Sequence, residues 1–172
     1  MDVFAIYPTL YRGHLGNEVL MTPRQLALTA GLGSAALLIG AFGFQYLGGL
    51  APCKMCIWQR YPHIAAVAIC LVFYVVQNRA VAAFGASASL ATAGIGFFHA
   101  GVEQGWWQGP SSCTSSAIEG LSTDDLINQI MSAPMVRCDE IPWALWGLSM
   151  AGWNAVLSLI LMGLWLMALR RL

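Results

Sequence analysis

The sequence predicts an all-α membrane protein, an antiparallel four-helix transmembrane bundle whose two larger loops lie on one side of the membrane. Three observations predict this fold. Of the 172 residues, 58% are hydrophobic and only 9% are charged, whereas a soluble domain carries roughly 25% charged residues. Four long stretches contain no Asp, Glu, Lys or Arg. Arginines and paired cysteines occur at opposite ends of these stretches.

The four uncharged stretches have about the length of membrane-spanning helices. They cover residues 25–52, 61–78, 80–102 and 142–169. About 20 apolar residues cross the hydrocarbon core of a bilayer, and a segment in lipid must pair its own backbone groups, so each span is expected to be helical. Because the second stretch is short, its helix is expected to begin near Ile57. The expected spans are residues 25–50, 57–77, 80–102 and 142–169.

The first stretch is interpreted as a retained span and not as a cleaved signal. It is longer than the 7–15-residue core of a signal peptide, and charged residues such as Asp2 and Glu18 precede it. The residues before Cys53 faintly resemble a lipoprotein cleavage site, but Pro52 fits that interpretation badly. Residues 1–24 are therefore expected to form a cytoplasmic segment, and residues 25–172 a single four-span redox domain.

Charge predicts the orientation, because basic residues near span ends mark the cytoplasmic side. An even number of spans brings five arginines to one face: Arg12, Arg24, Arg79, Arg170 and Arg171. The opposite face receives loops at residues 51–60 and 103–141, and the second loop has six acidic residues against one arginine, a net charge of −5. Both termini are expected in the cytoplasm and both loops outside, which in a bacterium is the periplasm.

Four of the five cysteines fall on that outer side. Cys53 and Cys56 form a CxxC pair in the first loop, and Cys113 and Cys138 lie in the second. Disulfides form and persist in the periplasm. Cys70 is 14 residues past Cys56, so it lies about 21 Å deeper in the membrane than Cys56 if the segment is helical. It is interpreted as a small core residue, since free cysteine packs well in apolar interiors.

The cysteines have three possible roles: redox exchange, permanent disulfides or zinc binding. Four sulfurs are enough for zinc, but a structural site usually uses two close pairs, whereas Cys113 and Cys138 are 25 positions apart. Positive charge near a thiol favours the reactive thiolate. Lys54 lies inside the CxxC pair, and Arg60 is four residues past Cys56, on the same helix face. These cations favour the redox role, although an arginine at a span entrance also serves as an interfacial anchor.

Two histidines in the spans are further candidates. His99 lies near the outer end of the third span, one turn before Glu103, and an ionisable residue within a membrane is a functional candidate by default. A structural histidine with satisfied hydrogen bonds is an equally good interpretation. His63 is two helical turns past Cys56 and ranks below His99.

Three motifs resemble the DsbB family of bacterial membrane proteins that generate disulfides. They are CKMCIWQR at residues 53–60, HAGVEQGWWQGPSSC at 99–113 and RCDEIPWALWGLSMAGWN at 137–154. The resemblance extends from Thr22 to Leu172. It implies an inner-membrane oxidoreductase that reoxidises a periplasmic thioredoxin-fold thiol oxidase, DsbA-like, and passes the electrons to membrane quinone, ubiquinone or menaquinone.

The resemblance also implies roles for individual residues. Cys53 and Cys56 would be the quinone-coupled pair, with Cys56 the sulfur that contacts quinone, while Arg60 and His99 would lie near the quinone. Cys113 and Cys138 would be the pair that meets the soluble partner. No metal is expected.

The order of exchange is predicted from access and from the same resemblance. Small residues flank Cys113, so its sulfur is expected to be approachable, and access decides which sulfur of a disulfide is attacked. Cys138 lies just before the expected fourth span, so we expect it to pass the electrons to Cys53.

Two alternatives remain open at this point. Vitamin K epoxide reductases are also small bundles with a CxxC pair and loop cysteines, but their loop pair precedes the CxxC pair in the chain. The other alternative is a non-enzymatic membrane subunit whose outer cysteines form two permanent disulfides.

Overall fold

The structure is a computed structural model that describes residues 21–110, 113, 122, 124, 127, 131 and 136–172. Its long helices are α2 (Pro23–Tyr46), α3 (Lys54–Val75), α4 (Arg79–Glu103) and α6 (Met150–Arg170). All four are long and apolar enough to cross a membrane, so the predicted all-α membrane fold is confirmed. The expected N-terminal segment and the middle of the loop at residues 103–141 lie largely outside the described residues.

Each helix begins at a side chain that accepts a backbone N–H bond from the first turn. Thr22 accepts from the Gln25 amide, and the Gln25 side chain accepts from the Thr22 amide, which is a capping box. Cys53, Asn78 and Ser149 cap α3, α4 and α6 in the same way. Such caps satisfy donors that a helix start otherwise leaves unpaired. The caps therefore set where the helices start more sharply than hydrophobicity does.

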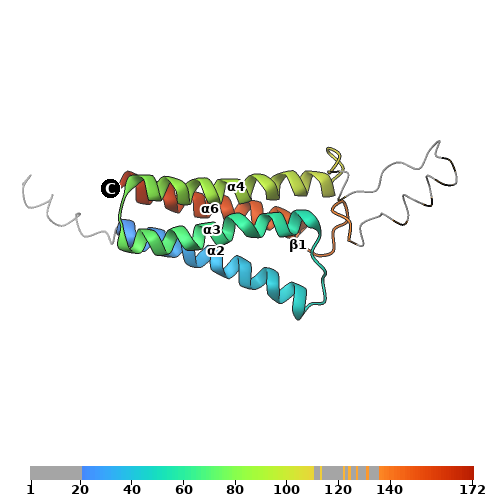
Figure 1. Cartoon of the computed structure of the whole chain (residues 1–172), viewed down its shortest axis with the longest axis horizontal. Coiled ribbons are helices and arrows are strands. Elements are labelled where there is room, and N and C mark those ends of the chain that lie inside the picture. The colour runs from blue at the N-terminus through green and yellow to red at the C-terminus, as the bar shows by residue number, and fades with distance from the viewer. Residues whose placement is uncertain are drawn as a thin grey trace, which may run out of the picture.

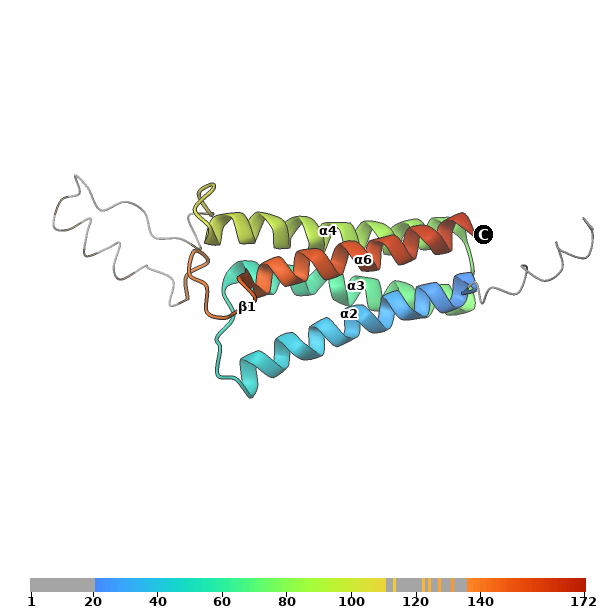
Figure 2. The ribbon, with the colours of Figure 1, turned by 180° about the vertical axis from the view of Figure 1, so that it is seen from behind.

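The helices form a closed antiparallel ring. Helices α2 and α4 each pack against both α3 and α6, and only residues 76–78 connect α3 to α4. In Figures 1 and 2, α2 lies close to the other helices at the end where the C-terminus is found and diverges from them toward its own C-terminal end. We call the opposite end of the bundle, where α3 begins and the strand β1 lies, the cysteine end.

The larger cluster of buried core residues lies toward the other end of the bundle. Phe73 and Trp165 are fully buried and meet edge to face, with ring centroids 5.7 Å apart. A Cβ atom on Gly85 would come within 2.5 Å of the Trp165 ring, so this position requires glycine. Cys70 is buried in the same cluster, and its thiol donates to the Ala27 carbonyl at 3.3 Å. It therefore lies among core residues, as the sequence predicts.

A short hairpin precedes α6. Strands β1 (Ala144–Leu145) and β2 (Leu148–Ser149) pair antiparallel, and the turn residues Trp146 and Gly147 have φ of 53° and 78°. Two-residue hairpin turns with positive φ match the twist of paired strands. The fourth helix consequently begins at Met150 and not near residue 142. Likewise α3 begins at Lys54 and not at Ile57, because Cys53 caps it, and α2 ends at Tyr46, before residue 50.

Candidate functional site

The CxxC pair forms the start of α3. Cys56 lies in the first helical turn and not in the expected loop, and its backbone N–H donates to Cys53 Sγ at 3.2 Å. The two sulfurs are 2.7 Å apart, with Cys53 as the donor. This hydrogen bond to Cys56, together with burial, raises the pKa of the Cys53 thiol. In the reduced pair, therefore, Cys53 keeps its proton and points it at Cys56.

The second cysteine pair is joined as a disulfide. Cys113 and Cys138 have Cα atoms 5.2 Å apart, and the Cys138 amide donates to the Cys113 carbonyl at 2.9 Å. Both side chains are 0% exposed. The expectation of an approachable Cys113 sulfur is therefore wrong for this state, because the disulfide packs into an apolar cluster with Met55 and Val102.

An ion pair between Arg137 and Asp139 lies next to this disulfide. Arg137 Nε lies 2.9 Å from one carboxylate oxygen of Asp139, and Nη2 lies 2.5 Å from the other. This two-point contact lowers the pKa of the Asp139 carboxyl. The pair flanks Cys138 on both sides in the sequence, so it stabilises the turn that carries the sulfur.

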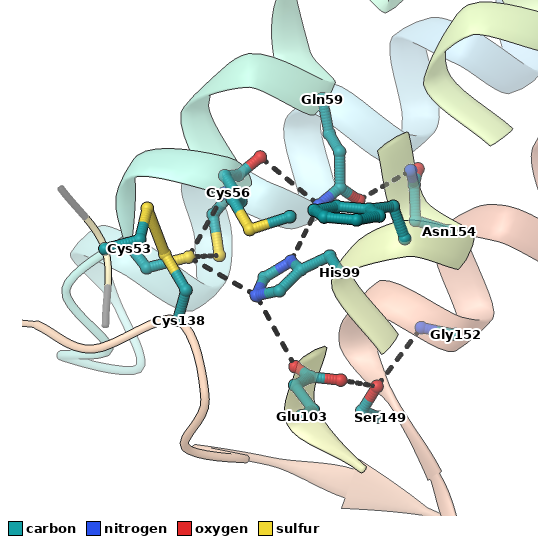
Figure 3. Close-up of polar contacts among 12 residues, drawn as sticks. Cys53, Cys56, Gln59, His99, Glu103, Cys138, Ser149, Gly152 and Asn154 are labelled. Atoms are coloured by element: carbon teal, nitrogen blue, oxygen red, sulfur yellow. Dashed lines mark hydrogen bonds and ion pairs between the residues drawn. A yellow bond between two sulfur atoms is a disulfide. The ribbon is translucent and has the colours of Figure 1, made fainter. Parts of the chain in front are cut away.

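The two cysteine pairs meet at one point (Figure 3). Cys53 Sγ, Cys138 Sγ and a ring nitrogen of His99 all lie within 4.8 Å of one another, and Cys53, Cys113 and Cys138 share one buried cluster. Thiol–disulfide exchange proceeds by attack of one sulfur on another, so transfer between the pairs requires only a small movement. The same three atoms are close enough to share a metal ion, but metal ligation needs a thiolate and Cys138 is bonded to Cys113.

His99 lies beside these sulfurs on α4. Its Nε2 atom is 3.6 Å from Cys53 Sγ and 3.8 Å from Glu103 Oε1, while Nδ1 is 2.9 Å from Gln59 Nε2. Glu103 also accepts a hydrogen bond from the Ser149 hydroxyl. The cap of α6 is therefore connected through Glu103 to the histidine at the dithiol.

Arg60 joins α3 to α2. Its Nη1 donates to Gln45 Oε1 at 2.7 Å and its Nη2 to the Ala41 carbonyl at 3.4 Å, and the guanidinium lies 4.8 Å from the Phe42 ring centroid. Lys54, the other cation near the dithiol, is exposed and lies over the Trp58 ring. Of the two cations that the sequence indicates, only Arg60 lines the internal cavity.

That cavity has a volume of about 600 Å³. Its apolar lining comes mainly from the second half of α2, the first half of α6, the hairpin and the loops that precede α3 and the hairpin. Its polar lining includes Cys56, Arg60, His63 and His99. Small-molecule sites are typically concave, apolar and of this size, with a few placed polar groups. The cavity therefore has the character of a site for a largely apolar ligand, and both cysteines of the CxxC pair line it.

Comparison with known proteins agrees with this arrangement. A family model for "Disulfide bond formation protein DsbB" matches residues 23–168. The chain belongs to the DsbB family. Relatives named Disulfide bond formation protein B include one from Stutzerimonas stutzeri, 32% identical over 78% of this chain and 87% of the relative. Another, from Verminephrobacter eiseniae, is 30% identical over 89% of each chain. No solved structure matches the chain.

Membership of the DsbB family makes the chain a disulfide-forming oxidoreductase of the membrane. The structure also brings together three polar residues that the sequence interpretation did not single out: Gln59, Thr92 and Asn154. They lie on α3, α4 and α6 and contact one another inside the bundle. Asn154 also accepts from His63 Nε2 at 2.8 Å, which places His63 in this polar network. Polar residues inside an uncharged span were the available signal.

Proposed function

We propose that this protein oxidises a periplasmic dithiol protein, a DsbA-like thioredoxin-fold thiol oxidase, and passes the electrons to membrane quinone. The observation that supports this most directly is the meeting of the two cysteine pairs at the mouth of an apolar cavity. A disulfide on the loop side suits a reductant in water. A cavity among transmembrane helices suits an oxidant dissolved in lipid.

The proposed exchange order begins at Cys113, and the sulfurs that lie close together support its second step. A thiolate of the partner attacks Cys113, forms a mixed disulfide and releases Cys138 as a thiolate. Cys138 then attacks Cys53, whose disulfide with Cys56 breaks and leaves the electron pair on Cys56. The proximity of Cys138 to Cys53 supports this second step. Burial of Cys113 means that the disulfide must first be uncovered for the partner to reach it.

The residues that line the cavity fit a quinone head group. Such a group, when bound, accepts the electron pair and two protons. Cys56 and Arg60 are one helical turn apart on the cavity side of α3, so a thiolate and a cation face the same space. The guanidinium has five N–H donors, and among the described residues the structure shows two hydrogen bonds from it. Donors therefore remain for a quinone oxygen.

The proposed orientation places the cysteine end in the periplasm and both termini in the cytoplasm. It is supported by the five arginines at the other face and the acidic loop at residues 103–141. The thiols would then lie in the compartment where disulfides persist.

The decisive experiment traps the partner. A reduced thioredoxin-fold partner that lacks its resolving cysteine should form a stable mixed disulfide with Cys113, identified by mass spectrometry of the complex. With intact partner, the purified protein should reduce added quinone, and Cys56→Ser should abolish the absorbance change. A crosslink to Cys138, or a complex that persists in Cys113→Ser, would refute the exchange order. Failure of the wild type to reduce quinone would favour a subunit with permanent disulfides.

A further inference from the structure

A chain of polar side chains runs from Cys53 into the membrane-spanning part of the bundle (Figure 3). Its members are His99, Gln59, Asn154, Thr92 and His63, contributed by three helices. All but Asn154 are buried. A buried polar group without a hydrogen-bond partner is costly, so the direction in which each group donates is constrained by its neighbours. Three backbone carbonyls fix these directions, those of Gln59, Thr92 and Met55.

The backbone carbonyls of Gln59 and Thr92 orient the Asn154 side chain. The Thr92 hydroxyl donates to the Gln59 carbonyl at 3.1 Å, so its oxygen is free to accept from Asn154 Nδ2, also at 3.1 Å. Nδ2 lies 3.4 Å from the Thr92 carbonyl as well, and a carbonyl can only accept. Asn154 therefore turns its NH₂ group toward Thr92 and Gln59, and its oxygen toward His63.

The same reasoning orients Gln59. Its Oε1 accepts from Asn154 Nδ2 at 2.8 Å, and its Nε2 lies 3.3 Å from the Met55 carbonyl. Nε2 is therefore the donor to His99 Nδ1, at 2.9 Å. A neutral imidazole carries one proton and has one acceptor nitrogen. With Nδ1 as the acceptor, the proton of His99 is on Nε2, the atom that faces Cys53.

We propose that Gln59 and Asn154 are positioning residues that hold His99 in the Nε2–H tautomer, so that it donates a hydrogen bond to Cys53 when this sulfur leaves as a thiolate. This inference rests on the proposed redox function. In the step concerned, the second cysteine of the partner has displaced Cys113 from the mixed disulfide and left it as a thiolate. This Cys113 thiolate attacks Cys138 in the Cys53–Cys138 disulfide. The Cys113–Cys138 bond forms, the Cys53–Cys138 bond breaks, and the electron pair stays on Cys53. No proton is transferred, and His99 stabilises the charge by donation.

The tautomer also bears on the zinc alternative. A histidine that binds metal uses a nitrogen lone pair and usually donates its other N–H to an acceptor. Here Nε2, the nitrogen beside the Cys53 sulfur, carries the proton, and Nδ1 accepts from Gln59. The direction of donation from Asn154 through Gln59 to His99 thus favours stabilisation of a thiolate by Nε2–H and disfavours metal ligation by Nε2.

The first test reads the tautomer directly. The full chain, labelled with ¹⁵N-histidine, is placed in lipid nanodiscs, and the His99 signals are identified by their loss in His99→Asn. We expect the proton on Nε2 in the wild type. Gln59→Glu keeps the size of the side chain but offers an acceptor, so it should put a proton on Nδ1. A wild-type proton on Nδ1, or an unprotonated Nδ1 in Gln59→Glu, would overturn the inference.

The second test measures release of Cys53. Thr92 Oγ1 accepts from Asn154 and so helps to hold the orientation of Asn154. During turnover with a reduced partner, Thr92→Val should slow decay of the Cys53–Cys138 disulfide roughly fivefold, since this single hydrogen bond is lost. Thr92→Ser keeps the hydroxyl and should restore most of the rate. Thr29→Val is the matched control, because among the described residues the Thr29 hydroxyl bonds only within its own helix, to the Gln25 carbonyl. Equal decay rates in Thr92→Val and the wild type would refute a role of this hydrogen-bond network in the release of Cys53. Absence of any exchange in the wild type would refute the proposed function and leave the tautomer test standing.

Discussion

Replacing Arg60 by alanine should weaken quinone binding without affecting the soluble partner. The guanidinium lies in the cavity wall, held by Gln45 and the Ala41 carbonyl, and has further N–H donors that could bind the proposed ligand. A hydrogen bond that involves a charged group contributes about 1.5–3 kcal/mol, which corresponds to roughly a 10- to 150-fold change in binding. The apparent quinone KM of Arg60→Ala should rise within this range. Arg60→Lys should recover only part, because an ammonium lacks the planar fork.

The assay follows quinone absorbance in nanodiscs at saturating reduced partner, with quinone concentration as the variable. Gln45→Ala removes one partner of the guanidinium but keeps its charge, so its effect should be smaller, about fivefold. Lys54→Ala is the matched control, because this cation is exposed and does not line the cavity. If Arg60→Ala leaves the quinone KM unchanged, or if Lys54→Ala raises it equally, Arg60 is an interfacial anchor and the reasoning fails.

Two further predictions concern orientation and packing. In a variant whose native cysteines are replaced by serine, a membrane-impermeant maleimide added outside cells should label Lys54→Cys, whereas Arg79→Cys should react only after permeabilisation; the reverse pattern would invert the proposed topology. Gly85→Ala should cost about 1–3 kcal/mol of stability through overpacking, because its Cβ would come within 2.5 Å of the Trp165 ring. Gly40→Ala, which meets nothing within 4 Å, should unfold on heating in detergent like the wild type, and equal losses in both variants would contradict the packing argument.

The number and class of the helices followed from composition, but their starts did not. The length of an uncharged stretch shows how many residues can enter lipid, but it does not distinguish an apolar hairpin from a helix. The fourth helix therefore begins at Met150, after the hairpin. The signal that would have located it is the Trp-Gly turn followed by Ser149 as a cap. Helix starts are local hydrogen-bonding events, so turn and cap residues predict them better than hydropathy does.

The candidate site was predictable where chemistry depends on short spacing. Cys53, Cys56 and Arg60 lie within one segment, and their relative positions follow from helical periodicity. The partners of His99 could not be found in this way. Gln59 contacts His99, 40 residues away in the sequence, and Asn154, 95 residues away, only because α3, α4 and α6 bring these side chains together inside the bundle. The burial of Cys113 likewise depends on packing against Met55 and Val102.

Because the Cys53 sulfur caps α3, the state of the dithiol is linked to the order of the first helical turn. The Cys56 amide donates to this sulfur, and an amide that loses its acceptor exchanges its hydrogen with solvent more readily. When Cys53 is drawn toward Cys138, this contact must lengthen. Hydrogen exchange at the Cys56 backbone amide would then report for what share of the time, during turnover, Cys53 is displaced toward Cys138.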